Sequence, residues 1–152
     1  MKNIFFLIVV FLIFSCKKKE AKKDENWFIV NDKNKIPQQI IDFFEAAENR
    51  PFEMANPDEE FNITDNVVNP SLPFRQLRLL ENKNEIWRMV YLQGGIGESY
   101  QFYEFRIHRD TISNSKKAYS FENIETNDSL EYYIKNGKVK FEKIKLKYKW
   151  ID

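Results

Sequence analysis

The order of apolar and polar residues along the chain predicts a sheet-rich domain with one early helix. Residues 27–30 form a short apolar run that ends in a polar turn, as in a buried first strand. Residues 37–48 repeat apolar side chains at spacings of three and four, and Pro37 and Pro51 bracket the pattern. This repeat predicts an amphipathic helix. Residues 50–73 are irregular and proline-rich, so we expect a long loop that covers one mouth of the sheet.

Period-two patterns then predict antiparallel strands. Residues 74–80 and 85–92 are typical of a hairpin, and residues 98–109 alternate as a long strand does. The glycine-rich residues 93–97 between them predict a turn, because a phosphate-binding loop would be followed by a helix.

The last third of the chain predicts weaker strands and a final hairpin. We expect a polar turn over residues 110–117 and a strand over residues 118–124. Residues 130–135 then pair with residues 138–150 across an Asn-Gly turn, which is the strongest hairpin signal in the chain. Apolar positions in the final strand change parity near Glu142, which predicts a β-bulge, and its lysines form a solvated face.

Together these elements predict an α+β fold, with one N-terminal helix packed on a curved antiparallel meander of about six strands. A small closed β-barrel is the alternative. Such scaffolds host many unrelated functions, so the fold alone assigns none.

The first sixteen residues read as an export signal. Lys2 is followed by an apolar run over residues 4–14, which is shorter than the roughly 20 residues that span a bilayer, and then by Ser15 and the only cysteine, Cys16. Residues 13–16, Ile-Phe-Ser-Cys, resemble the lipobox of bacterial lipoprotein precursors of the Bacteroidetes type. The resemblance is confined to the N-terminus. It implies cleavage before Cys16 and acyl chains, such as palmitate, on this residue.

This resemblance predicts three segments: a signal peptide at 1–15, a tether at 16–25 and one domain at 26–152. The tether is rich in lysine and lacks large apolar residues, so we expect it to be disordered. Its basic run differs from the acidic signal of surface-exported lipoproteins, which favours a periplasm-facing protein anchored in the cell envelope. The alternative is a free thiol at Cys16 after an ordinary secretory signal.

Composition excludes several classes of function. With Lys2 removed, basic residues equal the 23 acidic ones, so nothing in the overall charge favours nucleic acid. A single cysteine allows no internal disulfide, and stability must come from packing of a chain that is 16% aromatic. The lipobox resemblance predicts the membrane as a partner, through the lipid on Cys16. The envelope location and the aromatic content predict an envelope protein or a small apolar ligand as a second partner.

Candidate chemistry is sparse. The acidic residues between 42 and 65 lack the spacing of a calcium-binding loop, and His108 has no second histidine or cysteine beside it, so we expect no metal and no cofactor. We expect a non-catalytic binding module whose face combines aromatic and charged side chains from two strands. The residues of this face are Trp87, Arg88, Tyr91, Tyr100, Phe102, Glu104, Arg106 and His108.

Two other functions remain open. One is an accessory subunit of an envelope complex, and the other is an envelope hydrolase in which Glu98 or Glu104 acts with His108. Three-residue patterns at Thr111 and Ser129 resemble the O-glycosylation motif of Bacteroidetes secreted proteins. Asn62 begins an N-glycosylation sequon.

Overall fold

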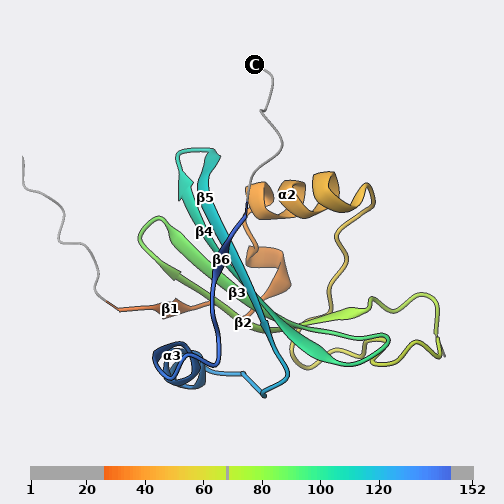
Figure 1. Ribbon diagram of the computed structural model, residues 1–152. Coiled ribbons are helices and arrows are strands. Elements are labelled where there is room, and N and C mark those ends of the chain that lie inside the picture. Colours follow the sequence, from red (N-terminus) through yellow and green to blue (C-terminus); the bar gives the residue numbers. More distant parts are fainter. Residues whose placement is uncertain (1–25, 68, 145–152) are drawn as a thin grey trace, which may run out of the picture.

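The computed structural model describes residues 26–67 and 69–144, which build a twisted six-stranded antiparallel sheet (Figure 1). The strand order follows the sequence from β1 to β6, so the predicted meander is confirmed, and the sheet does not close into a barrel. The strands are β1 (Phe28–Ile29), β2 (Arg75–Lys83), β3 (Ile86–Gln93), β4 (Ser99–His108), β5 (Thr111–Ser120) and β6 (Glu142–Lys143). The helices are η1 (Lys33–Lys35), α2 (Gln38–Glu48) and α3 (Asn127–Lys135).

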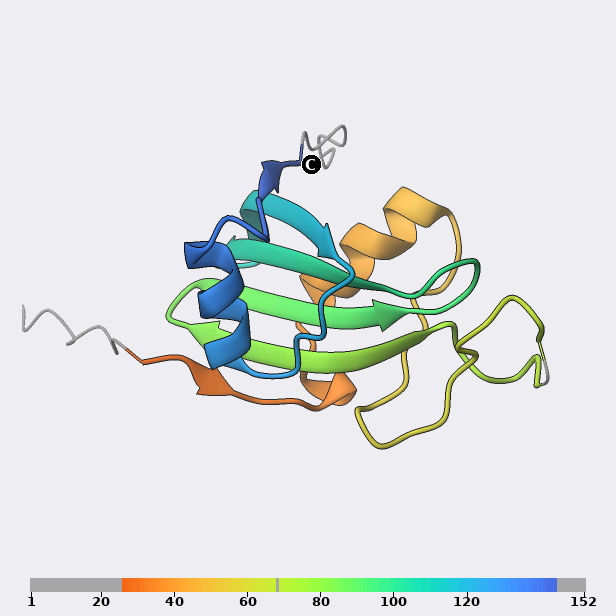
Figure 2. The ribbon, with the colours of Figure 1, turned by 60° about the horizontal axis from the view of Figure 1, so that its bottom comes forward.

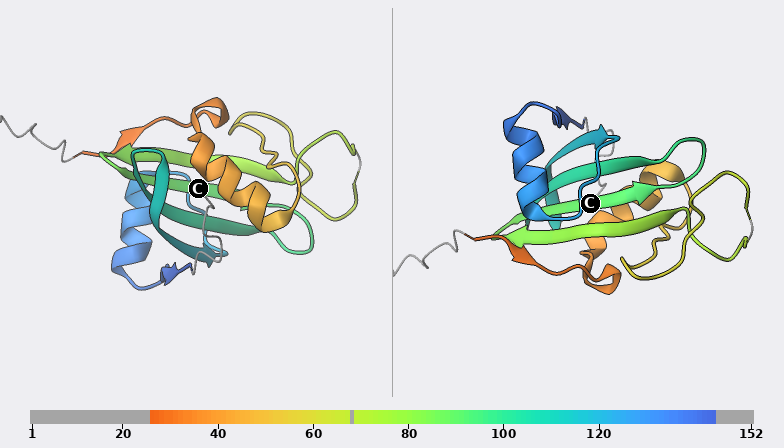
Figure 3. Two further views of the ribbon diagram at one scale, coloured as in Figure 1. Left: turned by 90° about the horizontal axis from the view of Figure 1, so that it is seen from above. Right: turned by 90° about the horizontal axis from the view of Figure 1, so that it is seen from below.

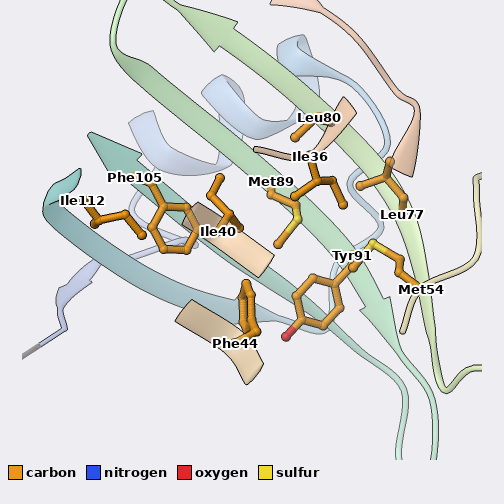
Figure 4. Close-up of a cluster of buried hydrophobic side chains, with 10 residues drawn as sticks. All are labelled: Ile36, Ile40, Phe44, Met54, Leu77, Leu80, Met89, Tyr91, Phe105 and Ile112. Carbon is orange, nitrogen blue, oxygen red and sulfur yellow. The ribbon is translucent and has the colours of Figure 1, made fainter. Parts of the chain in front are cut away.

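Helix α2 covers one face of the sheet, as its period predicts (Figure 3, left). Pro37 precedes it, and Asn49 ends it in the left-handed conformation with its N–H donated to the carbonyl of Glu45. Ile40 and Phe44 are its buried residues. Figure 4 shows them against side chains of β2, β3 and β4 in the first core cluster, which comprises Ile36, Ile40, Phe44, Met54, Leu77, Leu80, Met89, Tyr91, Phe105 and Ile112.

Helix α3 covers the opposite face, so the prediction of a strand over residues 130–135 is wrong (Figure 2). Thr126 caps the helix through a reciprocal capping box with Ser129. The buried Leu130 packs in a second core cluster, against which Tyr133 and Ile134 also pack. The cluster comprises Leu79, Val90, Phe102, Ala118, Ile124, Leu130 and Val139. The spacing of 130, 133 and 134 is helical, and it buries one side of α3 against the sheet.

The Asn-Gly dipeptide ends this helix rather than a hairpin, so that prediction is wrong too. Gly137 has φ 68° and donates its N–H to the carbonyl of Ile134, while Lys138 donates to the carbonyl of Tyr133. A left-handed glycine just past a helix is a common C-terminal stop. An Asn-Gly dipeptide can form either a hairpin turn or the end of a helix. Because a helix precedes it here, it forms the helix end.

The predicted turn at residues 110–117 is also wrong, because residues 111–117 belong to β5. Of the strand predicted over residues 118–124, only 118–120 belong to β5. The pairing of β4 with β5 runs from the pair His108–Thr111 to the pair Tyr100–Ser120. Its register shifts between Arg106 and Ile107. Of the predicted last strand, β6 contains two residues, and residues 145–150 lie outside the described ones. The predicted bulge near Glu142 depends on those residues.

The loop over residues 50–73 lies beside the start of β2 and the β3–β4 turn. Ala55 exchanges backbone hydrogen bonds with Arg75 and Leu77, which makes a parallel bridge along β2. The loop also fixes the glycine turn, since a Cβ on Gly94 would come within 2.1 Å of the carbonyl oxygen of Asn62. Only glycine allows this approach.

The predicted signal peptide, Cys16 and the tether all lie outside the described residues. Within residues 26–67 and 69–144, no helix is both long enough and apolar enough to cross a bilayer.

Candidate functional site

The eight residues predicted to share a face lie on both faces of the sheet. Trp87 and Tyr91 lie on the α2 face, where they pack with the first core cluster. Their neighbour Arg88 points the other way, because side chains alternate along β3. Tyr100 and Phe102 pack with the second core cluster on the α3 face, and Glu104, Arg106 and His108 follow them with the same parity on β4.

Arg88 is the centre of a charge cluster on the α3 face. Its Nε lies 3.2 Å from Glu104 Oε2, and its Nη1 binds Glu131 of α3 and lies 3.6 Å from Glu81 Oε1. Lys116 on β5 adds a second cation 2.9 Å from Glu104 Oε1. Strands β2 to β5 and helix α3 therefore meet through one set of ion pairs.

Glu81 is the most deeply placed carboxylate of the cluster, with no exposed surface. Asn127, the first residue of α3, donates its Nδ2 to both carboxylate oxygens at 3.0 and 2.8 Å. Burial raises the pKa of Glu81 above its ordinary value, although the Asn127 bond and the charge of Arg88 oppose this effect. Burial also acts to raise the pKa of Glu104, but hydrogen bonds from Lys116 and Arg88 outweigh it and lower that pKa.

Trp27, which directly precedes β1, packs against the Arg88 side chain of the cluster. The guanidinium carbon of Arg88 lies 4.0 Å from the centre of the Trp27 ring, within cation–π range. Arg88 is thus satisfied by three carboxylates and an aromatic face, and its side chain is 13% exposed. The charged groups of the cluster form ion pairs with one another. These pairs therefore hold α3 and the residues before β1 against the sheet.

Glu104 and His108 do not form the pair that a hydrolase would need. Glu104 binds Arg88 and Lys116, whereas His108 Nδ1 lies 2.6 Å from Glu85 Oε1 at the exposed β2–β3 turn. Arg106 lies 3.8 Å from the same Glu85 and is half exposed. These contacts are typical of cross-strand charge pairing at the end of a sheet.

Tyr91 on the α2 face is buried beside a second charge pair. Arg75 binds Glu48 at the end of α2, and the Arg75 guanidinium lies 5.7 Å from the Tyr91 ring. Burial raises the pKa of Tyr91 far above its ordinary value, so its hydroxyl stays protonated. Burial likewise acts to raise the pKa of Glu48, but hydrogen bonds from Arg75 and Arg50 lower it overall.

A groove lies beside the end of β5. It encloses about 790 Å³ between the C-terminal half of β5 and the segment that leads into β6. Tyr119 and Phe121 are 67% and 77% exposed, and their rings meet edge to face at 6.3 Å. None of the eight predicted residues lines this groove.

Lysine side chains frame the groove. Lys138 binds Glu122 at 2.9 Å and lies 5.2 Å from the Tyr133 ring. Lys117 and Lys140 are exposed and form no ion pair within the described part of the chain. The sequence signal that could have located the groove was the aromatic pair at 119 and 121, which fell in the strand predicted over residues 118–124 but was not assigned to the binding face.

The remaining sequence motifs are occupied or ordinary. Ser129 completes the α3 cap, and Asn62 is buried with its Nδ2 donated to the carbonyls of Asn69 and Leu72. Thr111 is exposed at the start of β5. In the acidic loop, Lys33 binds Glu59 and lowers its pKa to about 2. No group of three or more metal-ligating side chains occurs among the described residues.

Comparison of the chain with protein-family models, with curated proteins and with solved structures finds no significant match.

Proposed function

We propose that this chain is a lipid-anchored protein of the bacterial cell envelope whose domain is a non-catalytic module for binding another protein. The lipobox-like residues 13–16 support the anchor. The groove beside β5 carries the binding role, because it combines open volume with two exposed aromatic rings. Aromatic side chains are enriched at protein interfaces, where they supply most of the binding energy.

The charge cluster around Arg88 supports this proposal by what it holds in place. Its ion pairs join α3 to the sheet, and α3 in turn positions the segment after Gly137 that forms the far wall of the groove. A hydrolytic function gains no support from this geometry, because Glu104 and His108 bind different partners. The groove is also wide open and partly polar, which suits a protein segment better than a small apolar ligand.

Native mass spectrometry of the full-length protein, extracted from its own membranes in mild detergent, tests both parts of the proposal. We expect a mass that shows cleavage before Cys16 with acyl chains attached, and a second protein that travels with the domain. The matched variant Cys16→Ser should lose the acyl mass and leave the membrane fraction, because it has no acyl chain to hold it in the bilayer. An unmodified thiol at Cys16 would contradict the anchor, and an acylated protein that always travels alone would contradict the binding role.

A further inference from the structure

We propose that the groove receives an extended segment of the partner protein, which adds to β5 as a further strand. This inference rests on the proposed binding function and names the form of the partner: a short extended stretch with acidic side chains. Addition of a strand to a sheet edge gives affinity through backbone hydrogen bonds and specificity through alternate side chains.

The backbone at the end of β5 presents the edge that this mode requires. The β5–β6 ladder of the described chain has two pairs, Lys116 with Lys143 and Lys117 with Glu142. Ile144 donates its N–H to the carbonyl of Ser115, so from Ser115 onward the odd-numbered residues of β5 direct their backbone groups away from β4. Tyr119 is the next such residue, and it lies beyond the end of the ladder. Its N–H and C=O therefore point away from β4, at the sheet edge that the groove borders.

The groove exists because the chain before β6 is drawn away from β5. Val139 is buried in the second core cluster, and both it and Lys138 donate their N–H groups to the carbonyl of Tyr133 at the end of α3. The segment therefore reaches β5 only at Glu142. Packing of Val139 in the core keeps the edge beyond Lys117 open.

The side chains around the open edge indicate the chemistry of the incoming segment. Tyr119 and Phe121 offer exposed rings for apolar or aromatic side chains. Lys117 and Lys140 form no ion pair in the described part of the chain, while Glu142 supplies one acidic group on the same rim. The excess of unpaired lysines favours a segment with carboxylates.

The position of the groove in the sheet favours a protein over the membrane as its occupant. β1 follows directly after the predicted tether and lies at one edge of the sheet, whereas the groove lies along β5 near the other edge. Four strand spacings of about 4.8 Å separate β1 from β5, or about 19 Å. The groove is thus directed away from the edge at which the chain enters the domain.

Site-specific photo-crosslinking in the native envelope tests the inference. The full-length protein would carry Phe121→benzoylphenylalanine in the groove or, as the control, Phe28→benzoylphenylalanine on β1, which is 67% exposed. We expect position 121 to crosslink to one segment of a partner protein with alternating apolar and acidic residues, and position 28 not to reach that segment. Digestion and peptide mass analysis identify the attached segment.

The segment found in this way is then synthesised and titrated into the full-length protein in detergent. We expect Tyr119→Pro to bind about tenfold more weakly than Tyr119→Thr, because both lose the ring and only proline loses the outward N–H. If Tyr119→Pro does not fold, amide exchange of Tyr119 in the unaltered protein replaces it, and binding should slow that exchange at least tenfold.

The outcomes separate this inference from the proposed function. Crosslinks from position 121 to a second copy of the chain or to lipid alone would overturn strand addition by a partner, as would equal binding of the two Tyr119 variants. A partner captured only from position 28 would leave the binding function in place and refute the groove. No protein crosslink from either position, together with a solitary protein in the native mass spectrum, would refute both.

Discussion

Removal of the Arg88 guanidinium by Arg88→Met is the most informative perturbation of this fold. The three carboxylates around Arg88 differ in what each retains after the change. Glu104 keeps Lys116 at 2.9 Å, and the side chain of Glu131 is 48% exposed, so water can solvate it. Glu81 has no exposed surface and keeps only the uncharged Asn127. The substitution therefore leaves one buried carboxylate without a cation.

The expected cost follows from this uncompensated charge. Breaking a buried ion pair by removal of one partner costs about 3–5 kcal/mol. The pKa of Glu81 is already raised by burial, so this carboxyl can take up a proton and limit the cost to the lower end of that range. We expect the free energy of unfolding at pH 7 to fall by about 3 kcal/mol, which urea denaturation followed by tryptophan fluorescence would measure.

The dependence on pH provides the sharpest check. Without Arg88 the folded-state pKa of Glu81 rises further above its unfolded value, so its stabilising contribution is complete at low pH and is lost as pH rises through the folded pKa. The difference between the variant and the unaltered protein should therefore shrink as pH falls from 7 to 5.

Two further variants act as controls for this reasoning. Arg88→Met with Glu81→Leu should recover most of the lost stability, because it removes the stranded charge, and Glu131→Gln should cost less than about 1 kcal/mol. A loss below about 1 kcal/mol for Arg88→Met, or no recovery in the double variant, would refute the view that Glu81 depends on Arg88.

Three other predictions concern the two helices and their contacts. Phe44→Ala should lower the free energy of unfolding by about 3–5 kcal/mol in urea titration, because Phe44 is 3% exposed between α2 and the sheet. Thr126→Ala should cost about 1 kcal/mol by thermal unfolding, since it removes the side-chain acceptor that caps α3, and Thr126→Ser should restore it. Glu48→Gln should cost about 1–2 kcal/mol at neutral pH through the weakened bond to Arg75. The lowered pKa of Glu48 means that this difference is present above its unfolded pKa and disappears as pH falls through the folded pKa, which acid titration of stability would show.

Helix α2 and strands β2 to β4 could be predicted from the sequence because local pattern and tertiary contacts agree there. The predicted buried first strand is wrong, since β1 has two residues and both are exposed. Residues 37–48 have a helical period, and the structure buries the apolar side of that helix. The hairpin of β2 and β3 and the strand β4 combine strand-forming residues with period two, and each pairs with its neighbour in sequence. Consistency between levels of this kind makes a pattern reliable.

The prediction for the last third of the chain was wrong where one local sequence pattern is compatible with two different structures. Residues 130–135 contain adjacent tyrosines and an isoleucine, which favour a strand, but the cap at Thr126 and the core contacts of Leu130 select a helix. The first part of β5, residues 111–117, was missed for the opposite reason. Its residues 113–117 are all polar, and their place in the sheet comes from pairing with β4 rather than from their own pattern.

The same errors explain why the predicted binding face was not found as one surface. Because α3 was not predicted, the sequence placed Arg88 and Glu104 on an exposed face beside aromatic residues. In the structure α3 covers them and supplies Glu131, which binds Arg88, and Asn127, which binds Glu81. Alternation along β3 and β4 also divided the eight residues between the two faces of the sheet. Side-chain parity was available from the sequence, but the second covering helix was not.

The lysines near the C-terminus gain a more specific role from this arrangement. Lys138 lies against Tyr133, which helps to hold the segment before β6 close to α3, and it binds Glu122 just past the end of β5. Lys117 and Lys140 flank the edge that this leaves open. Lysines at a sheet edge oppose pairing with arbitrary strands, because a neutral or basic strand would bury their charge uncompensated. A strand with carboxylates at the matching positions escapes that penalty, so the charges that protect the edge from aggregation would also select its partner.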